Sequence, residues 1–248
     1  MYAIITKELK KSIQDRGLLF WTLLLPIIFT VLFISVFTSG VTEAEKQQVI
    51  VSIVSGYTIM FVFFIIISMV DSFIKDSEIG IIARIASTSL PSHFYLLGKW
   101  ISYMVLVLLQ IVILTIFGKL VYDIPLQQPL YLVTLFLFLT IMVTGSGLVM
   151  ATLVKSLNMG IALTQVVALG GAVLSGLWIP IEMMPAFIQQ ISQFLPHYWA
   201  HQAFQDAMAG TLLLFDLFQT LLVLLGFSLV GFIIAWLGYP SFLKRAKG

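Results

Sequence analysis

Residues 71–99, DSFIKDSEIGIIARIASTSLPSHFYLLGK, form the longest polar break in a sequence that is otherwise strongly apolar. The apolar residues in its middle recur at the spacing of one helix face: Ile79, Ile82, Ile85 and Ala86. Glu78 and Arg84 fall on other faces, which predicts a short amphipathic helix over 77–88, lying along a membrane surface. Pro91 would end this helix, because proline lacks the amide proton. Two interpretations stay open: a helix that docks onto a soluble partner, and a solvated connector.

The sequence on both sides of this break has the composition of an integral membrane protein. Of its 248 residues, 60% are hydrophobic and 10% are charged, whereas soluble domains carry about 25% charged residues. A hydrocarbon core about 30 Å thick needs about 20 apolar residues in a helix. Six stretches meet this requirement: 17–37, 50–70, 100–121, 130–154, 160–179 and 217–238. We expect all six to be helices, because lipid offers backbone amides no other partner.

The first 16 residues, MYAIITKELKKSIQDR, are predicted to form an amphipathic helix in the lipid headgroup region. Its apolar residues recur at helical spacing: Ile4, Ile5, Leu9 and Ile13. Its basic residues are Lys7, Lys10, Lys11 and Arg16. No small-residue cleavage site follows, so we expect this segment to be retained and not removed as a signal peptide.

Lysine and arginine predict the orientation of the six spans, because these residues concentrate on the cytoplasmic side of membrane proteins. With the N-terminus in the cytoplasm, only Lys46 and Lys119 of the 13 lysines and arginines lie on the outer side. The opposite orientation would reverse this distribution. We therefore expect a plasma-membrane protein with both termini, and the break at 71–99, in the cytoplasm.

The longest outer connection is expected at residues 180–216, which contain no lysine or arginine. Within it, residues 183–204, MMPAFIQQISQFLPHYWAHQAF, alternate apolar residues with glutamines. We predict one or two interfacial or re-entrant helices here, broken at Pro196 and dipping into the outer leaflet without crossing it.

The predicted spans carry almost no chemistry of their own. Lys119 is their only ionisable residue, and it lies near an outer end, where it can reach the headgroups. Transporters driven by protons or sodium usually hold a carboxylate or histidine near the bilayer midplane, so we expect the energy for any transport to come from outside the bilayer. The sequence has no GxxxxGK[ST] phosphate loop, and we expect neither enzyme activity nor a cofactor in this chain. The absence of cysteine excludes disulfides and thiolate metal sites.

His197 and His201 are four residues apart and would share one face of a helix, as paired metal ligands do. The residues between them lack the glutamate of an HExxH motif. We therefore favour an interfacial histidine pair beside Tyr198 and Trp199 in the aromatic belt. A membrane-embedded, metal-dependent hydrolase is the alternative that these two histidines leave open.

Four residues of the spans are candidates for lining a pathway. Gln110 and Gln165 are the polar side chains most suited to face a cavity, although an interhelical hydrogen bond is the more common role of such a glutamine. Ser175 and Trp178, near the end of the fifth span, are the other two candidates. The spacing of Gly171 and Ser175 also predicts a close helix contact, within the chain or between subunits.

Two segments of the chain resemble the type-2 permeases of ABC transporters, the drug-resistance kind with six spans. The first match lies within the polar break: Asp76, Glu78, Gly80, Arg84, Thr88, Leu90, Leu97, Gly98 and Lys99. It departs from the family pattern at Ile81, where a threonine is usual, and at Pro91, which comes two places late. The second match lies before the last span: Ser175, Gly176, Pro180, Glu182, Pro185 and Pro196. The basic residue that often closes this second segment is absent.

The resemblance implies an all-helical membrane fold in which residues 1–248 form one permease domain in a bacterial cell membrane. It also implies two separately encoded ATPase subunits, which carry the ATP and Mg²⁺ and dock from the cytoplasm. A second permease subunit, identical or a close relative, would complete the pathway, and no nucleic acid would be involved. Residues 77–88 would be the coupling helix. The family contact to the ATPase would then include Asp76, Glu78, Gly80, Arg84, Thr88 and Pro91.

The expected function is ATP-driven export of an apolar or amphipathic substrate, such as an antibiotic or a lipid-like molecule. Relatives that export polysaccharide-lipid, peptide or sodium leave these cargoes open as well. The alternatives are the metal-dependent hydrolase built on His197 and His201, and a membrane subunit that transports nothing.

Overall fold

The protein is described by a computed structural model that covers residues 2–87 and 93–246. These two ranges fold into helices joined by turns, and they contain no β-strand. Six helical segments are long and apolar enough to cross a membrane: Arg16–Phe37, Glu45–Glu78, Phe94–Tyr122, Pro129–Leu153, Leu157–Leu174 and Leu214–Lys244. The predictions of an all-helical chain and of six such helices are therefore confirmed.

The N-terminal part is a chain of four helical elements. They are α1 (Tyr2–Gln14), α2 (Arg16–Leu19), the π-helix η1 (Phe20–Leu24) and α3 (Leu25–Phe37). The side chain of Asp15 caps α2 by accepting a hydrogen bond from the amide of Leu18 at 3.0 Å. Pro26 explains the wider π turn: it has no amide for the carbonyl four residues back, and the amide of Leu25 bonds instead to the carbonyl of Phe20, five residues back.

The second membrane segment consists of α4 (Glu43–Phe63) and α5 (Ile65–Glu78). Gly80 follows with a φ of +71°. This left-handed conformation ends the helix, and glycine adopts it without the steric strain that other residues incur. The next helix, α6 (Ile81–Ala86), is therefore shorter than the helix predicted over residues 77–88. Thr88 and Pro91 lie outside the described residues.

The remaining elements complete the bundle. They are α7 (His93–Tyr122), α8 (Pro129–Leu153), α9 (Leu157–Gln165), the π-helix η2 (Val166–Gly170), α10 (Gly171–Leu174), the 3₁₀-helix η3 (Ile181–Met183), α11 (Ala186–Ser192), α12 (Pro196–Ala209) and α13 (Leu214–Ala246). The fifth segment ends at Leu174, five residues before the predicted bound, because Gly176 takes a φ of +77°. The break at Pro196 is the start of α12, where a proline loses no helical hydrogen bond.

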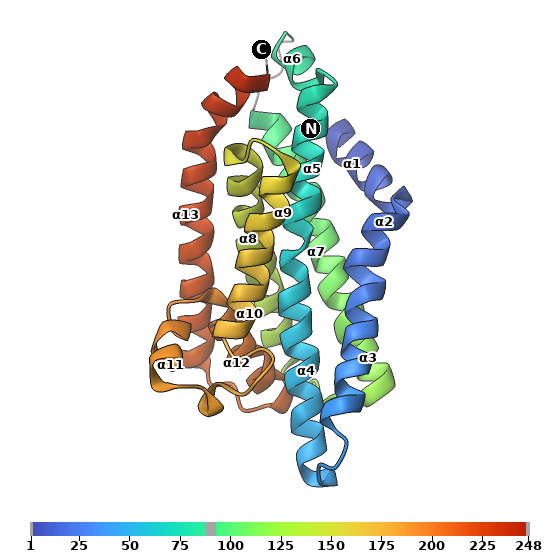
Figure 1. Cartoon of the computed structure of the whole chain (residues 1–248), viewed down its shortest axis with the longest axis vertical. Coiled ribbons are helices and arrows are strands. Elements are labelled where there is room, and N and C mark those ends of the chain that lie inside the picture. The colour runs from blue at the N-terminus through green and yellow to red at the C-terminus, as the bar shows by residue number, and fades with distance from the viewer. Residues whose placement is uncertain (1, 88–92, 247–248) are drawn as a thin grey trace.

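Helix α8 lies at the centre of the packing, in contact with α5, α7, α12 and α13. Helix α4 packs against α3, α7 and α12, while α1 lies on α7 and α9 lies on α5 (Figure 1). Helix α6 rests on α5 and α13. The outer faces of the bundle remain apolar: on α13, for example, Leu222 is 67% exposed and Leu237 is 71% exposed. Such a surface suits contact with lipid tails.

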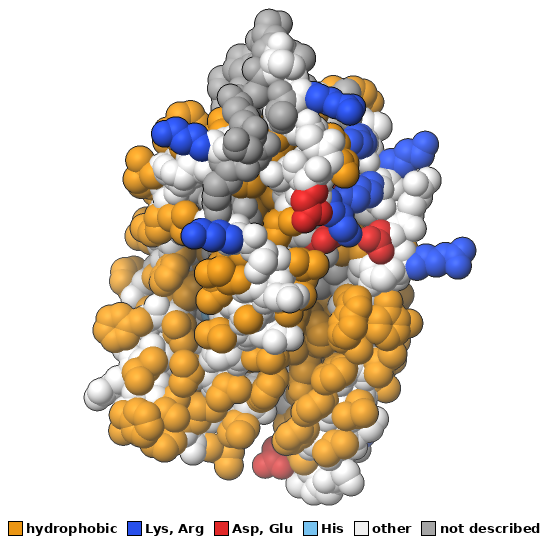
Figure 2. Space-filling model, turned by 45° about the horizontal axis from the view of Figure 1, so that its top comes forward, with side chains coloured by type: hydrophobic (Ala, Val, Ile, Leu, Met, Phe, Trp, Pro, Cys, Tyr) orange, Lys and Arg blue, Asp and Glu red, His pale blue; other side chains and the backbone are white. Residues whose placement is uncertain are grey.

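Charge is separated between the two ends of the bundle. Both chain ends and α6 lie at one end, and α11 and α12 lie at the other (Figure 1). Figure 2, turned toward the α6 end, shows lysine and arginine side chains gathered there above a broad apolar surface. Among the side chains that the structure describes, the exposed basic residues of this end are Lys7, Lys10, Lys11, Arg16, Lys75, Arg84, Lys155 and Lys244. Lys46 and Lys119 lie at the opposite end, near the start of α4 and the end of α7.

Candidate functional site

An apolar groove runs between the first, second and fifth membrane segments. Its volume is about 520 Å³. Its walls come from three places along the chain: Asp15 to Phe29, Met60 to Ser68, and Ile161 to Trp178. Its polar lining residues are Asp15, Thr22, Ser68 and Gln165. The rest of the lining is aliphatic or aromatic: Leu18, Trp21, Leu25, Phe29, Met60, Phe61, Phe64, Ile67, Ile161, Leu169 and Trp178.

Both π-helices contribute to this groove. Trp21 and Thr22 belong to η1, and Leu169 belongs to η2. A π turn adds one residue to a helical turn, which alters the direction of the side chains that follow, and such turns occur often at functional sites. The two irregular turns therefore both lie on the wall of this groove.

Two of the four residues predicted to line a pathway do line this groove. Gln165 and Trp178 are both on its wall. Gln110 and Ser175 are not: they are 1% and 0% exposed, inside the bundle. Neither the amide of Gln110 nor the hydroxyl of Ser175 has a hydrogen-bond partner within the described part of the chain. The interhelical hydrogen bond considered for Gln110 is therefore not formed among these residues.

The α6 end presents a small mixed surface. Glu78 and Arg84 are exposed, and Ile79 between them is 62% exposed. Ile82 points the other way and is 2% exposed. The apolar face predicted for this segment is only partly formed: Ile82 is buried, but Ile79 is exposed and lies at the end of α5, before the six residues of α6.

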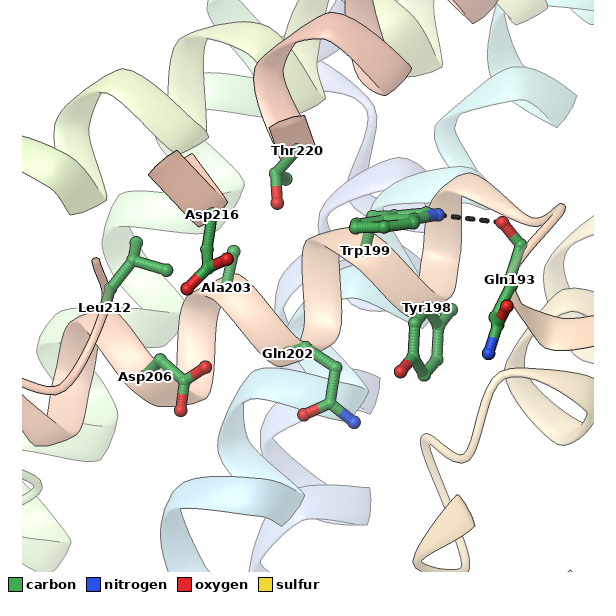
Figure 3. Close-up of a pocket in the computed structure, with 9 residues that line it drawn as sticks. All are labelled: Gln193, Tyr198, Trp199, Gln202, Ala203, Asp206, Leu212, Asp216 and Thr220. Carbon is green, nitrogen blue, oxygen red and sulfur yellow. Dashed lines mark hydrogen bonds between the residues drawn. The ribbon is translucent and has the colours of Figure 1, made fainter. Parts of the chain in front are cut away.

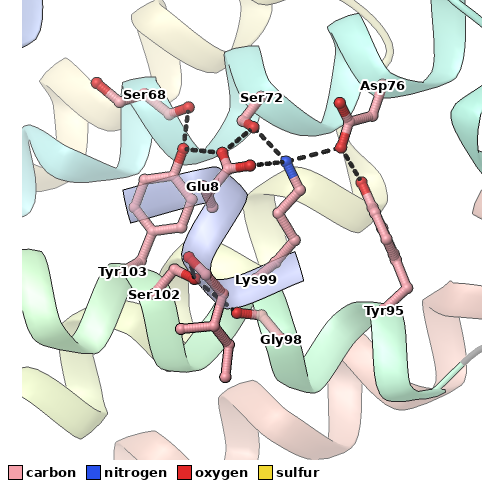
Figure 4. Close-up of polar contacts among 10 residues, drawn as sticks. Glu8, Ser68, Ser72, Asp76, Tyr95, Gly98, Lys99, Ser102 and Tyr103 are labelled. Carbon is pink, nitrogen blue, oxygen red and sulfur yellow. Dashed lines mark hydrogen bonds and ion pairs between the residues drawn. The ribbon is translucent and has the colours of Figure 1, made fainter. Parts of the chain in front are cut away.

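Asp76, predicted to belong to this surface, lies elsewhere. It is 7% exposed and belongs to a buried polar cluster, defined here as Glu8, Ser72, Asp76, Tyr95, Lys99 and Tyr103 (Figure 4). The ammonium of Lys99 is 2.8 Å from a carboxylate oxygen of Glu8 and 2.7 Å from one of Asp76, and it also contacts the hydroxyl of Ser72. The hydroxyl of Tyr95 donates to Asp76 at 2.9 Å.

The buried polar cluster ties three helices together near the α6 end. Glu8 comes from α1, Asp76 from α5 and Lys99 from α7. The approach of α1 to α7 is close, because a Cβ atom at Gly98 would lie 2.9 Å from the side chain of Ile4. A buried ammonium needs its carboxylate partners, so the cluster fixes α1 and α5 relative to α7.

Composition and hydropathy gave no sign of this cluster, because Glu8 and Lys99 belong to segments that were predicted to lie at the membrane surface or in the cytoplasm. Helical periodicity could have indicated it. Tyr95, Lys99 and Tyr103 repeat every four residues, which places them on one face of α7. Ser72 and Asp76 share the same spacing on α5.

His197 and His201 lie inside the bundle, so their side chains do not face outward as the predicted interfacial pair would. Each is 2% exposed. The ring of His197 stacks on Phe63 with centroids 4.0 Å apart. A Cβ atom at Gly171 would lie 2.4 Å from the His197 ring, so the glycine allows a close contact between these two residues of the chain. Nε2 of His201 lies 3.2 Å from the carbonyl oxygen of Ser52.

The two histidines therefore contact different neighbours. Among the described residues, no group of three or more histidine, cysteine, aspartate or glutamate side chains could hold a metal ion. Burial lowers the pKa of His197 to about 3. Burial also lowers the pKa of His201 to about 4, against the hydrogen bond to Ser52, which acts in the opposite direction. Both rings are neutral at physiological pH.

Comparison with known proteins gives concordant results. A sequence model of the family described as ABC-2 type transporter matches residues 1–209. A protein of Bacillus subtilis (strain 168) with the provisional name transport permease YvfS is 27% identical over 202 residues, which cover 77% of this chain and 78% of that protein. The linearmycin resistance permease protein LnrN of the same organism is 24% identical over 190 residues, which cover 77% of this chain and 49% of LnrN.

Proposed function

The chain belongs to the ABC-2 type transporter family and is a multi-pass transport permease subunit, and we propose that it forms the membrane part of an exporter driven by separate ATPase subunits. The cargo is an apolar or amphipathic molecule, such as an antibiotic or a lipid-like compound. The name of LnrN, which refers to linearmycin resistance, is in keeping with this class of cargo.

The apolar groove is the observation that carries the proposal. A volume of about 520 Å³ lies within the range of small-molecule sites. Its wall is largely aliphatic and aromatic, with a few polar groups such as Gln165 and Thr22 that can orient a ligand. Transfer of an apolar molecule from the bilayer into such a groove costs little free energy. A highly charged molecule would have to give up its hydration, which is costly.

The α6 end is the cytoplasmic end in this proposal. The basic residues of the chain concentrate there, as the positive-inside rule requires. Exposed Glu78, Ile79 and Arg84 supply charge and apolar area to a docked ATPase. ATP, with Mg²⁺, is bound by that partner and not by this chain.

Force applied to α6 has a defined route into the bundle. Helix α6 rests on α5 and α13, and the buried polar cluster links α5 to α1 and α7. Closure of the ATPases would shift α6 and bias the bundle between two arrangements, which open the pathway inward and outward. A second permease subunit, a copy of this chain or a close relative, completes the pathway.

The test is transport by the chain reconstituted in proteoliposomes with its ATPase subunits. Leu169→Trp places an indole in the groove from η2, and we expect ATP-dependent export of a fluorescent amphiphile to fall several-fold, while the ATPase still co-purifies. Leu222→Trp is the matched control, because Leu222 is 67% exposed on α13 and lines no part of the groove.

Undiminished export by Leu169→Trp would contradict the assignment of the groove. Absence of ATP-dependent export in the unaltered complex, with the ATPase bound and active, would contradict the exporter as a whole.

A further inference from the structure

A second pocket, of about 390 Å³, opens at the α12 end of the bundle. It lies between α12, the start of α13 and the turn before α12 (Figure 3). The residues that matter here are Tyr198, Trp199, Asp206, Asp216 and Thr220. This pocket shares no lining residue with the apolar groove, and its lining includes two aspartates, two glutamines and a threonine.

The pocket holds two carboxylates and no basic side chain. Asp206 comes from α12 and Asp216 from the first turn of α13. None of the nine lining residues is a lysine or an arginine. Partial burial raises the pKa of Asp206, and the nearby carboxylate of Asp216 raises it further. The hydrogen bond from Thr211 lowers this pKa, but the net shift is upward. A cation bound between the two carboxylates would remove this repulsion.

Aromatic rings form another part of the wall. The indole N–H of Trp199 donates to the carbonyl of Gln193 at 2.8 Å, which fixes the ring in place (Figure 3). The ring of Tyr198 meets that of Trp199 edge to face, with centroids 5.8 Å apart. The faces of such rings attract organic cations, and tryptophan does so most strongly.

Thr220 is an independent sign of a ligand. It is 3% exposed, it lines the pocket, and its hydroxyl makes no hydrogen bond to any described residue. Thr134 and Thr152 bond back to the carbonyl four residues earlier, whereas the hydroxyls of Thr115, Thr140 and Thr164 are buried without a partner among the described residues. Thr220 differs from these three because it lines this pocket. The side chain of Thr220 is buried, but its hydroxyl oxygen is not sealed inside the bundle and points into the pocket (Figure 3). A bound group can therefore supply the hydrogen bond that no described residue supplies.

We propose that this pocket binds the protonated amine of an amphipathic molecule. The ammonium lies between Asp206 and Asp216, the rings of Tyr198 and Trp199 contact the adjacent carbon atoms, and the hydroxyl of Thr220 accepts one N–H. Leu212 offers apolar contact to the start of the tail. The amine can belong to a soluble amphiphile or to a lipid headgroup such as phosphatidylethanolamine.

The test measures equilibrium binding to the purified full chain in a neutral detergent, without ATPase or nucleotide, so it stands apart from the test of transport. Octylamine and octan-1-ol are compared by isothermal titration calorimetry, because they differ only in the charged group. We expect octylamine to bind at least about tenfold more tightly. The double change Asp206→Asn and Asp216→Asn should remove this preference, and Thr220→Val should weaken octylamine binding several-fold.

Asp123→Asn is the matched control, because the Asp123 side chain is 90% exposed, pairs with Lys119 and lies outside the pocket. Thermal unfolding of each variant checks that it is folded. Competition by added phosphatidylethanolamine would identify the lipid as the source of the amine, and lack of competition would identify a soluble amphiphile. Equal binding of the amine and the alcohol, or equal losses in Asp123→Asn and in the double variant, would overturn the proposal.

Discussion

The ammonium of Lys99 neutralises two carboxylates that α1 and α5 bring to it, and all three groups are almost fully buried. Lys99→Met keeps the length of the side chain and removes its charge, so Glu8 and Asp76 lose their buried cation. Removal of one partner from a buried ion pair typically costs about 3–5 kcal/mol. We expect a loss of this order in the free energy of unfolding, measured by titration with a denaturing detergent.

Lys75→Met is the control for Lys99→Met. Lys75 pairs with Asp71 on the same helix, α5, at 2.7 Å, but its side chain is 57% exposed. An exposed pair of this kind contributes less than about 1 kcal/mol. Restoring neutrality with Glu8→Gln and Asp76→Asn should recover part of the stability of Lys99→Met. If the two lysine variants lost equal stability, the importance of the buried polar cluster would be refuted.

The buried imidazole of His197 predicts a dependence of stability on pH. Its pKa is about 3 in the folded chain and 6.5 in the unfolded one, so the unfolded chain takes up the proton first as the pH falls. The free energy of unfolding should therefore decrease below pH 6.5, by about 1.4 kcal/mol per pH unit for this group. His201, with a folded pKa of about 4, adds a similar slope.

His197→Phe isolates this contribution, because the ring contacts of Phe63 are kept and no hydrogen bond of the described residues is lost. The variant should be about as stable as the unaltered chain at pH 7 and lose about half of the slope between pH 6 and pH 4.5. Unfolding followed by tryptophan fluorescence at several pH values measures both. An unchanged slope would show that this imidazole is not buried as a neutral ring.

At the scale of elements, the proposed ATPase contact is formed by the end of α5 and by α6, which carry the exposed charges Glu78 and Arg84, and these charges can be tested directly. Reversal of both exposed charges, Glu78→Lys with Arg84→Glu, should lower the amount of ATPase that co-purifies with the chain. Interfacial charge pairs affect both the rate and the strength of association. Glu182→Lys, an exposed change at the α12 end, should have no effect. Equal recovery of the ATPase with all variants would rule out α6 as the docking element.

The sequence predicted best those elements whose position is determined by their own residues. Long apolar runs predicted the six spanning helices, and Pro196 marks the start of α12 because proline favours a first helical turn. The ends of α5 and α10 were predicted less well. They depend on left-handed glycines, Gly80 and Gly176, and a glycine in an apolar run does not reveal its φ angle.

The candidate sites were only partly predictable, because they depend on contacts between distant segments. Of the four candidates named from the sequence, Gln165 and Trp178 lie on the wall of the groove, and the role of this groove as a pathway stays a proposal. The buried polar cluster was missed, since its members come from positions as far apart as Glu8 and Tyr103. The burial of His197 was missed as well, since it requires Gly171 and Phe63 on other helices.

For the molecule as a whole, the separation of charge between the two ends predicts how it sits in the membrane. The sequence contains no cysteine, so a single introduced cysteine is the only target for a thiol reagent. Arg84→Cys places the thiol at the α6 end, and Glu182→Cys places it at the α12 end; both positions are exposed. With the α6 end in the cytoplasm, a membrane-impermeant maleimide should label Glu182→Cys in intact cells and Arg84→Cys only in inverted vesicles. Labelling of Arg84→Cys in intact cells would reverse the orientation, and an ATPase driven by cytoplasmic ATP could then not reach α6.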